Sequence, residues 1–119
     1  MAYIDGFVVP ILPGKREAYI ALAKQAAPVF LDHGALQVVE TLADDVKHGK
    51  ITDFYRAVAA EEGETVNFSW ILWPSKAARD EGMAKVMADD RMKPDSDMPF
   101  DMQRMIFGGF EIVVDTKAG

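Results

Sequence analysis

The sequence predicts an α+β protein with two helices on one face of a four-stranded antiparallel sheet. Segments rich in β-forming residues alternate with two long segments of helical periodicity, in the order strand, helix, strand, small insertion, strand, helix, strand. Half of the residues are hydrophobic and 27% are charged, a balance typical of globular chains. At 119 residues the chain is large enough for one core, so we expect a single domain over residues 1–119.

The first half of the chain predicts a strand, a helix and a second strand. The segment YIDGFVVPIL (3–12) is rich in β-formers and ends at a Pro-Gly turn. From Lys15 the apolar residues recur at helical spacing as far as Gly34, which is a natural C-terminal stop. Residues 35–45 indicate the second strand.

The middle of the chain predicts a short helix, a third strand and a second long helix. Residues 52–58 fit a short helix capped by Thr52 and also fit strand alternation, and the helix is the preferred interpretation. The segment TVNFSWILW (65–73) is the clearest strand of the chain. Ser75 then provides an N-cap for a second long helix that runs to about Asp90.

The carboxy-terminal part combines a loop with a glycine-bearing strand. Residues 91–103 contain two prolines and alternating charge, and we expect this loop to cover one end of a cavity. The last strand, 104–115, contains Gly108 and Gly109, which fall on opposite faces. The preferred interpretation is a bulge that bends the strand. The alternative is a gap that admits a ligand, and one feature can serve both purposes.

This order of elements fits a ferredoxin-like βαββαβ sandwich, in which the sheet face opposite the helices is left open. A sheet that is wet on one side should alternate cleanly between apolar and polar residues. Here both faces are largely apolar: in the first strand Ile4 and Val8 oppose Phe7 and Val9. We therefore expect a second copy of the chain to cover the open face, which makes the protein a homodimer.

Composition excludes several classes of partner. The net charge of -6 and the pI near 4.8 oppose binding to the phosphate backbone, so no nucleic acid partner is expected. No apolar run approaches the roughly 20 residues that span a bilayer, so no membrane partner is expected. The absence of cysteine and of a basic, apolar leader in MAYIDGFVVP predicts a cytoplasmic location.

Three strands each place an acid in an apolar row, and these acids are the clearest chemical feature of the sequence. They are Asp5, Glu40 and Glu111. Burial and like charge raise the pKa of a carboxylate, which prepares it as a general acid or base. Asp5 and Glu111 lie on strands that are neighbours in this fold, so they are candidates for a buried, coupled pair. The preferred interpretation is that the acids lie near strand ends or dimer edges and form structural ion pairs with Arg56, Arg104 or a lysine, because such pairs also perturb titration.

His33 is the candidate base among the imidazoles, because histidine titrates nearest neutrality. It also precedes the glycine that ends the first helix, where the helix dipole favours it, and that structural interpretation is preferred. His48 lies in a polar turn. The two histidines do not have the spacing of a metal pair, and no HExxH motif exists, so no metal site is predicted.

Trp70 and Trp73 lie on one strand and face opposite sides. We expect one to pack in the helix-facing core and the other to reach a cavity or the dimer interface, although core packing is the preferred role for either one alone. Arg91 is a candidate anchor for an anionic ligand, with a capping or ion-pair role as the preferred alternative. No nucleophile elbow, P-loop or dinucleotide motif occurs, and no cofactor is predicted.

Seven blocks that run almost from end to end of the chain carry a family resemblance. They are YIDGFVVP, HGALQVVE, TDFYRAV, NFSWILWPSKAARD, DDRMKP, MPFD and RMIFGGFE. Together they resemble the YbaA-like family of bacterial proteins of unknown function, in the dimeric α/β-barrel superfamily. The resemblance implies a ferredoxin-like protomer whose sheet pairs with that of a second copy to form a barrel. Superfamily relatives include cofactor-independent monooxygenases, small-ring isomerases, haem-binding enzymes and proteins with no known chemistry.

Three functions remain open at the level of sequence. The first is a homodimeric protein that binds a small apolar or aromatic molecule, and the lack of a nucleophile or metal motif favours it. The second is an enzyme of the monooxygenase or isomerase kind, in which Asp5, Glu40 or Glu111 acts as base and a tryptophan stacks on the substrate. The third is a purely structural dimer. A pocket with two polar groups within hydrogen-bond reach would favour the enzyme, and a filled core the structural dimer.

Overall fold

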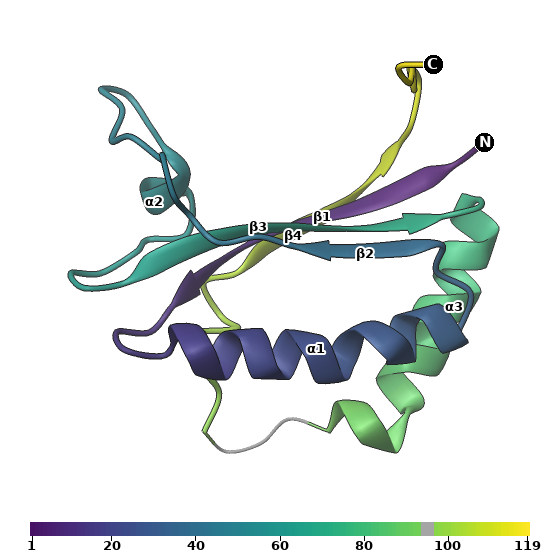
Figure 1. Cartoon of the computed structure of the whole chain (residues 1–119), viewed down its shortest axis with the longest axis horizontal. Helices are drawn as coiled ribbons and strands as arrows, with labels where there is room; N and C mark the ends of the chain where they lie inside the picture. The colour runs from purple at the N-terminus through teal and green to yellow at the C-terminus, as the bar shows by residue number, and fades with distance from the viewer. Residues whose placement is uncertain (94–96) are drawn as a thin grey trace.

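The chain folds as a ferredoxin-like α+β sandwich (Figure 1). A computed structural model describes residues 1–93 and 97–119. The four strands pair in the order β2-β3-β1-β4, and each neighbouring pair is antiparallel. The elements in chain order are β1 (Tyr3–Ile11), α1 (Arg16–Asp32), β2 (Gln37–Glu40), α2 (Phe54–Ala57), β3 (Thr65–Trp73), α3 (Lys76–Ala88), the 3-10 turn η1 (Asp90–Met92) and β4 (Ile106–Glu111).

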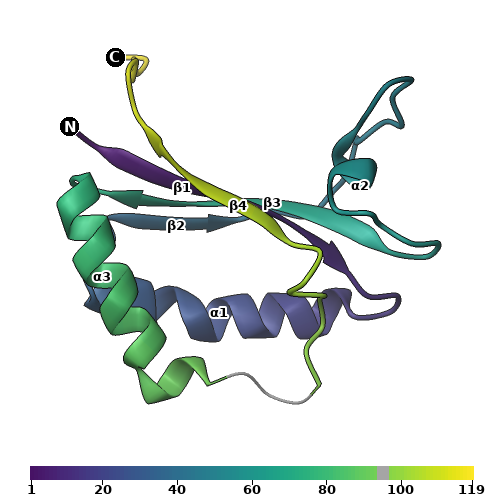
Figure 2. The same ribbon diagram turned by 180° about the vertical axis from the view of Figure 1, so that it is seen from behind.

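Both long helices lie on one side of the sheet (Figure 2). The register of β1 aligns Asp5 with Ile71 on β3 and with Gly109 on β4. Odd-numbered residues of these three strands therefore point to the helices, and even-numbered residues point away from them. On β2 the relation is reversed, because Val38 pairs with Ile71.

The helix-facing side holds two buried clusters. One is centred on Val9, Ile11 and Tyr19, and the other on Ala35, Ile71 and Trp73. The polar side chains of Asn67 and Ser69 are also buried on β3: Asn67 pairs with Val9 of the first cluster, and Ser69 lies next to Ile71 of the second on the same face. The core of this protomer is thus interrupted by a polar stretch that needs hydrogen-bond partners.

Close packing of α3 depends on a glycine. A Cβ atom added to Gly82 would lie 2.4 Å from the Trp73 ring and 2.5 Å from the His33 carbonyl oxygen. Only glycine therefore allows α3 to approach both β3 and the end of α1. Trp73 becomes fully buried as a result.

Local structure differs from the sequence prediction in several places. The last strand, β4, covers only Ile106–Glu111 and pairs with β1 in unbroken register through Gly108 and Gly109, so the predicted bulge is not formed. The β2 strand is shorter than predicted and ends at Glu40. The short helix α2 is capped by Asp53, whose carboxylate accepts the Arg56 backbone N–H, and Thr52 is not the cap. Part of the predicted lid loop, residues 94–96, lies outside the described residues. Its later part is fastened to the sheet, because the Leu12 N–H donates to the Pro99 carbonyl at 2.9 Å.

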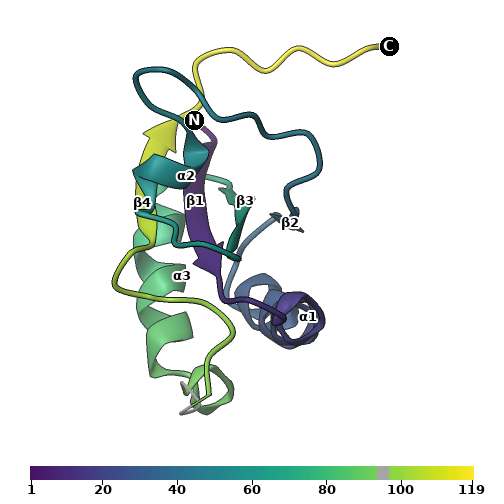
Figure 3. The same cartoon turned by 90° about the vertical axis from the view of Figure 1, so that its left-hand side faces the viewer.

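The sheet face turned away from α1 and α3 is called the open face below. It carries Ile4, Gly6, Val8, Phe68, Trp70, Leu72, Gly108 and Phe110. Two segments rise from it on the side away from the helices (Figure 3). One, residues 44–60 with α2, is called the arm, and the other, residues 112–119, is called the tail. They stand at opposite ends of the strands.

Candidate functional site

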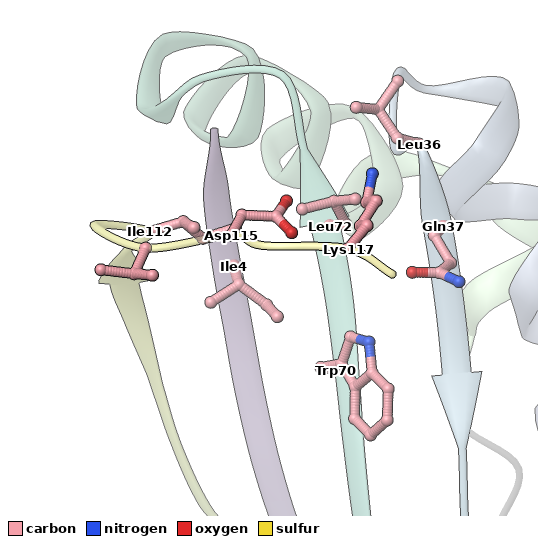
Figure 4. Close-up of a pocket in the computed structure, with 9 residues that line it drawn as sticks. Ile4, Leu36, Gln37, Trp70, Leu72, Ile112, Asp115 and Lys117 are labelled. Carbon is pink, nitrogen blue, oxygen red and sulfur yellow. The ribbon is translucent and has the colours of Figure 1, made fainter. Parts of the chain in front are cut away.

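The open face contains a hollow of about 630 Å³ beside Trp70. Ile4, Trp70 and Leu72 form its floor, and the tail crosses above the strands at this end of the sheet (Figure 4). Its other lining residues are Leu36, Gln37, Ile112, Val114, Asp115 and Lys117. The hollow is therefore apolar at the floor, with polar groups at its rim.

A second hollow of about 300 Å³ lies on the same face, under the arm. Phe54 on α2 and Phe68 on β3 line it, and Trp70 belongs to both hollows. The Phe68 ring packs edge-on against Trp70, with the ring centroids 5.6 Å apart. Trp70 thus stands at the centre of an aromatic surface that neither long helix, α1 or α3, covers.

A polar network occupies the helix-facing side of the sheet. The Tyr19 hydroxyl donates to Glu40 Oε1 at 2.6 Å, and Asn67 Nδ2 donates to the same oxygen at 2.8 Å. The Asn67 amide also donates to the Tyr19 oxygen at 2.8 Å, and its own Oδ1 accepts the Val9 N–H at 3.2 Å. This last bond fixes the orientation of the amide, so the network has a single donor and acceptor assignment.

Burial shifts the titration of two members of this network. Desolvation raises the pKa of Glu40, while the bonds from Tyr19 and Asn67 act in the opposite direction. Desolvation also raises the pKa of Tyr19, and the adjacent Glu40 carboxylate adds to the effect. The Glu40 residue as a whole is exposed at the sheet edge, although its Oε1 atom is bound within the network, so the carboxyl group can exchange a proton with solvent. The geometry suits a group that holds a proton at higher pH than an ordinary glutamate.

Asp5 is buried but has cationic and neutral partners. Arg79 Nε lies 3.1 and 3.2 Å from its two oxygens, Arg79 Nη2 lies 3.0 Å from Oδ1, and Trp73 Nε1 donates to Oδ2 at 3.0 Å. Glu111 is exposed. The buried, uncompensated pair of Asp5 and Glu111 that the sequence allowed is therefore not formed, because a guanidinium from α3 neutralises Asp5.

The two adjacent glycines of β4 have different surroundings. A Cβ atom at Gly109 would lie 2.5 Å from Arg79 Nη2 and would also collide with the Tyr3 hydroxyl. A Cβ atom at Gly108 would meet only the Phe110 ring, at 3.5 Å. Gly109 thus leaves room for the pair of Arg79 and Asp5, and Gly108 leaves shallow space on the open face.

His33 and Arg91 meet at the junction between the ends of α1 and α3. His33 Nε2 lies 2.9 Å from Asp89 Oδ2, and Arg91 Nη2 lies 2.8 Å from the same oxygen. Arg91 Nη1 also reaches Asp32 at 2.9 Å. Hydrogen bonds from Arg91 and His33 lower the pKa of Asp89. These contacts tie the helices together, and the charge of Arg91 is matched by two carboxylates.

The candidate residues therefore fall into separate places. Glu40 lies in the Tyr19 network, Trp70 lies on the open face, and Asp5, Trp73 and Gly109 belong to one cluster around Arg79. Sequence reasoning missed Tyr19, Asn67 and Arg79. Asn67 carried a signal, since it is a polar residue in a helix-facing row of the clearest strand. Among the described residues no cluster of three potential ligands for a metal ion occurs, and no helix has the length and apolarity to cross a membrane.

Comparison with known proteins gives consistent matches over most of the chain. A family model described as a protein of unknown function (DUF1428) matches residues 2–102. The uncharacterized protein YbaA of Escherichia coli K12 is 53% identical over 116 residues, which cover 97% of this chain and 99% of the relative. YbaA of Shigella flexneri matches to the same extent.

Among solved structures, a Bacillus cereus protein with a provisional assignment as an antibiotic biosynthesis monooxygenase superposes with a TM-score of 0.58. The match covers 100% of this chain and 98% of that chain at 10% sequence identity. At this identity the match shows a common fold, and it carries no information about activity.

Proposed function

The chain belongs to the DUF1428 family of proteins of unknown function, and we propose that it is a homodimer that binds a small apolar or aromatic molecule. In this proposal the open faces of two protomers pack together, and the ligand occupies the hollow beside Trp70. The resemblance to the YbaA-like family noted from the sequence is confirmed by the relatives. Those relatives have no described activity, so the proposal rests on the geometry of this chain.

The position of Trp70 is the observation that carries the proposal. Trp70 lines both hollows of the open face, and the larger, about 630 Å³, is within the range of about 300–1,000 Å³ of small-molecule sites. The surrounding floor is aliphatic, and the polar rim supplies Gln37, Asp115 and Lys117. An indole ring on an apolar floor suits a flat, apolar ligand, because stacking adds to the burial of surface.

The surface area of the protomer supports the homodimer. The accessible surface is 7957 Å², whereas a monomer of this mass is expected to expose about 6,400 Å². The excess of about 1,500 Å² exceeds the roughly 800 Å² per partner of a standard interface. Exposed apolar residues on the open face include Phe68 at 44% and Phe110 at 60%. A second open face is the most direct cover, because a self-complementary surface closes as a twofold dimer.

A dye titration tests the ligand site. We expect 8-anilinonaphthalene-1-sulfonate to bind the purified protein with transfer of energy from tryptophan, and Trp70→Ala to weaken that binding at least about tenfold. Phe107→Ala is the matched control, because Phe107 is 70% exposed on the helix-facing side of the edge strand. Equal binding by wild type and both variants would contradict the Trp70 site.

The network of Glu40, Tyr19 and Asn67 supports a second candidate function, proton transfer to or from a small substrate. Glu40 Oε1 accepts two hydrogen bonds, and burial raises the pKa of the carboxylate, so Glu40 is suited to act as a general acid or base. Carbon-13 NMR titration of the Glu40 carboxyl group tests this function. We expect a pKa clearly above that of exposed glutamates, and an ordinary pKa would end the proposal.

A further inference from the structure

The arm carries an isoleucine that has almost no contact within its own chain. Ile51 is 94% exposed, the most exposed large apolar side chain among the described residues. It stands on the segment that rises from the open face, on the side away from the helices (Figure 3). A single exposed apolar residue needs no explanation, but the loop that presents Ile51 is unusually well fastened.

Five interactions hold the loop around Ile51. The Asp53 carboxylate accepts the backbone N–H groups of Gly49, at 3.0 Å, and of Arg56, at 2.7 Å. The Arg56 side chain donates to the Lys50 carbonyl at 2.9 Å. The Tyr55 hydroxyl donates to the Val46 carbonyl at 2.9 Å, and the Tyr55 ring stacks on His48 at 4.2 Å.

The loop is also sterically restricted. A Cβ atom at Gly49 would collide with the Thr52 carbonyl, so this turn requires glycine. Ordering such a loop costs conformational entropy and gains no apolar burial for Ile51 within the protomer. A well-fastened loop that exposes an apolar side chain is suited to docking, because the entropic cost of ordering the loop is met before association.

The tail presents the complementary surface at the other end of the open face. Val113 is 78% exposed and Val114 is 79% exposed, and Val114 also lines the hollow beside Trp70. The tail passes over the ends of the strands at this hollow (Figure 4). The protomer therefore has exposed apolar side chains at both ends of one face and an open hollow next to one of them.

A single twofold operation brings these two ends together. When two open faces pack about 10 Å apart, the twofold axis lies between the sheets and parallel to them. An axis along the strands would place both arms at the same end, where they compete for the same space. An axis across the strands places each arm over the tail end of the other protomer, and the contact is made twice.

We propose that in the homodimer Ile51 of each protomer packs against Val113 and Val114 of the partner subunit and closes the partner's hollow beside Trp70. This inference rests on the proposed function, because it requires the open faces to pair. It adds a specific consequence: each ligand cavity is built from two chains, with its floor from one protomer and its cover from the arm of the other. The binding site is then incomplete in an isolated protomer.

Cysteine cross-linking tests the contact directly, since the chain contains no cysteine. We expect the variant Ile51→Cys, Val114→Cys to form a covalent dimer on oxidation or with a short bismaleimide, because a disulfide needs Cα atoms within about 7 Å. The control is Ile51→Cys, Met87→Cys. Met87 is 75% exposed on α3, on the opposite side of the sheet, and should give no covalent dimer.

The outcomes separate the inference from the proposed function. A covalent dimer with the Val114 variant alone supports the inference. A protein that sediments as a dimer but gives no covalent dimer overturns the inference and leaves the proposed function standing. A monomer overturns both. A link within one chain, seen as a cross-linked species with the mass of one protomer, also overturns the inference, because the arm would then meet its own tail.

A charge substitution provides an independent measurement. We expect Ile51→Asp to weaken dimerisation at least about tenfold, measured by sedimentation, and to weaken the dye response at Trp70 by a similar factor. The circular dichroism of the variant should be unchanged, because Ile51 makes almost no contact within the protomer. Met87→Asp, with the same change of charge on a helix, should leave dimerisation and the dye response unchanged. Equal behaviour of the two variants would overturn the inference.

Discussion

The two glycines of β4 allow a matched comparison that tests the packing of the sheet. They are adjacent in sequence and point to opposite faces. At Gly109 a methyl group would lie 2.5 Å from Arg79 Nη2 and would collide with Tyr3, whose ring lies under the Arg79 guanidinium at 5.2 Å. Neither side chain can move freely, because Arg79 is bound to the buried Asp5.

We expect Gly109→Ala to destabilise the protein by about 2–4 kcal/mol. Overpacking of a well-filled site costs about 1–3 kcal/mol. Displacing Arg79 also weakens its ion pair with the buried Asp5 carboxylate. This loss costs less than breaking a fully buried ion pair, because Arg79 is partly exposed. For a chain of 119 residues, the unfolding entropy is such that each kcal/mol of destabilisation lowers the melting temperature by about 4 °C. The melting temperature of Gly109→Ala should therefore fall by about 8–16 °C.

Gly108→Ala is the control and should behave differently. Its methyl group would meet only the Phe110 ring, at the ordinary contact distance of 3.5 Å. The loss of chain entropy in the unfolded state favours alanine by about 0.4–1 kcal/mol, so this variant should match or slightly exceed the wild type. Differential scanning calorimetry of both variants measures the contrast. A Gly109→Ala protein that melts within about 1 °C of the Gly108→Ala protein would refute the argument.

Two further predictions concern Glu40 and Trp73. Burial raises the pKa of Glu40 above 4.5. Between pH 4.5 and the raised pKa, the native state therefore binds more protons than the unfolded state. The free energy of unfolding should fall as the pH rises through that window. Urea unfolding at several pH values should show this slope in the wild type and a smaller slope in Glu40→Gln; identical slopes would contradict the assignment. Trp73→Phe should lower stability by about 2–4 kcal/mol, because it removes the donor to buried Asp5 and opens a cavity, whereas Trp70→Phe should change it by less than about 1.5 kcal/mol. Chemical denaturation compares the two, and equal losses would contradict their different environments.

The fold could be predicted from the sequence because local signals agreed with one another. The strand over residues 65–73 and the N-cap at Ser75 are confirmed, and the order of elements permits few topologies. The predicted cap at Thr52 was wrong. Thr52 and Asp53 are both good N-cap residues, and only the backbone geometry selects Asp53. The second strand was overextended, because β2 ends at Glu40. The Thr41 and Ala43 backbone N–H groups still donate to the Phe68 and Val66 carbonyls of β3, so contact with the sheet continues for a few residues.

The candidate site was less predictable, because its partners are distant in sequence. The period of the strand indicated that Asp5 lies in an apolar row, but Arg79 reaches it from 74 residues away and changes its chemistry. The bond between Glu40 and Tyr19 likewise joins α1 to β2. Pairing of this kind depends on how helices pack on the sheet, which periodicity does not specify. The sequence placed Trp70 and Trp73 on opposite faces of one strand, but it did not indicate which of them lies on the open face.

Sedimentation equilibrium of the purified protein at micromolar concentration tests the central claim most directly. Two open faces that pair should give a species of twice the protomer mass of 13.2 kDa. Trp70→Asp should shift that species to the single mass while its circular dichroism is retained, because the charge would be buried between the sheets. A wild-type protein that remains at 13.2 kDa, or a dimer that Trp70→Asp leaves intact, would contradict the account.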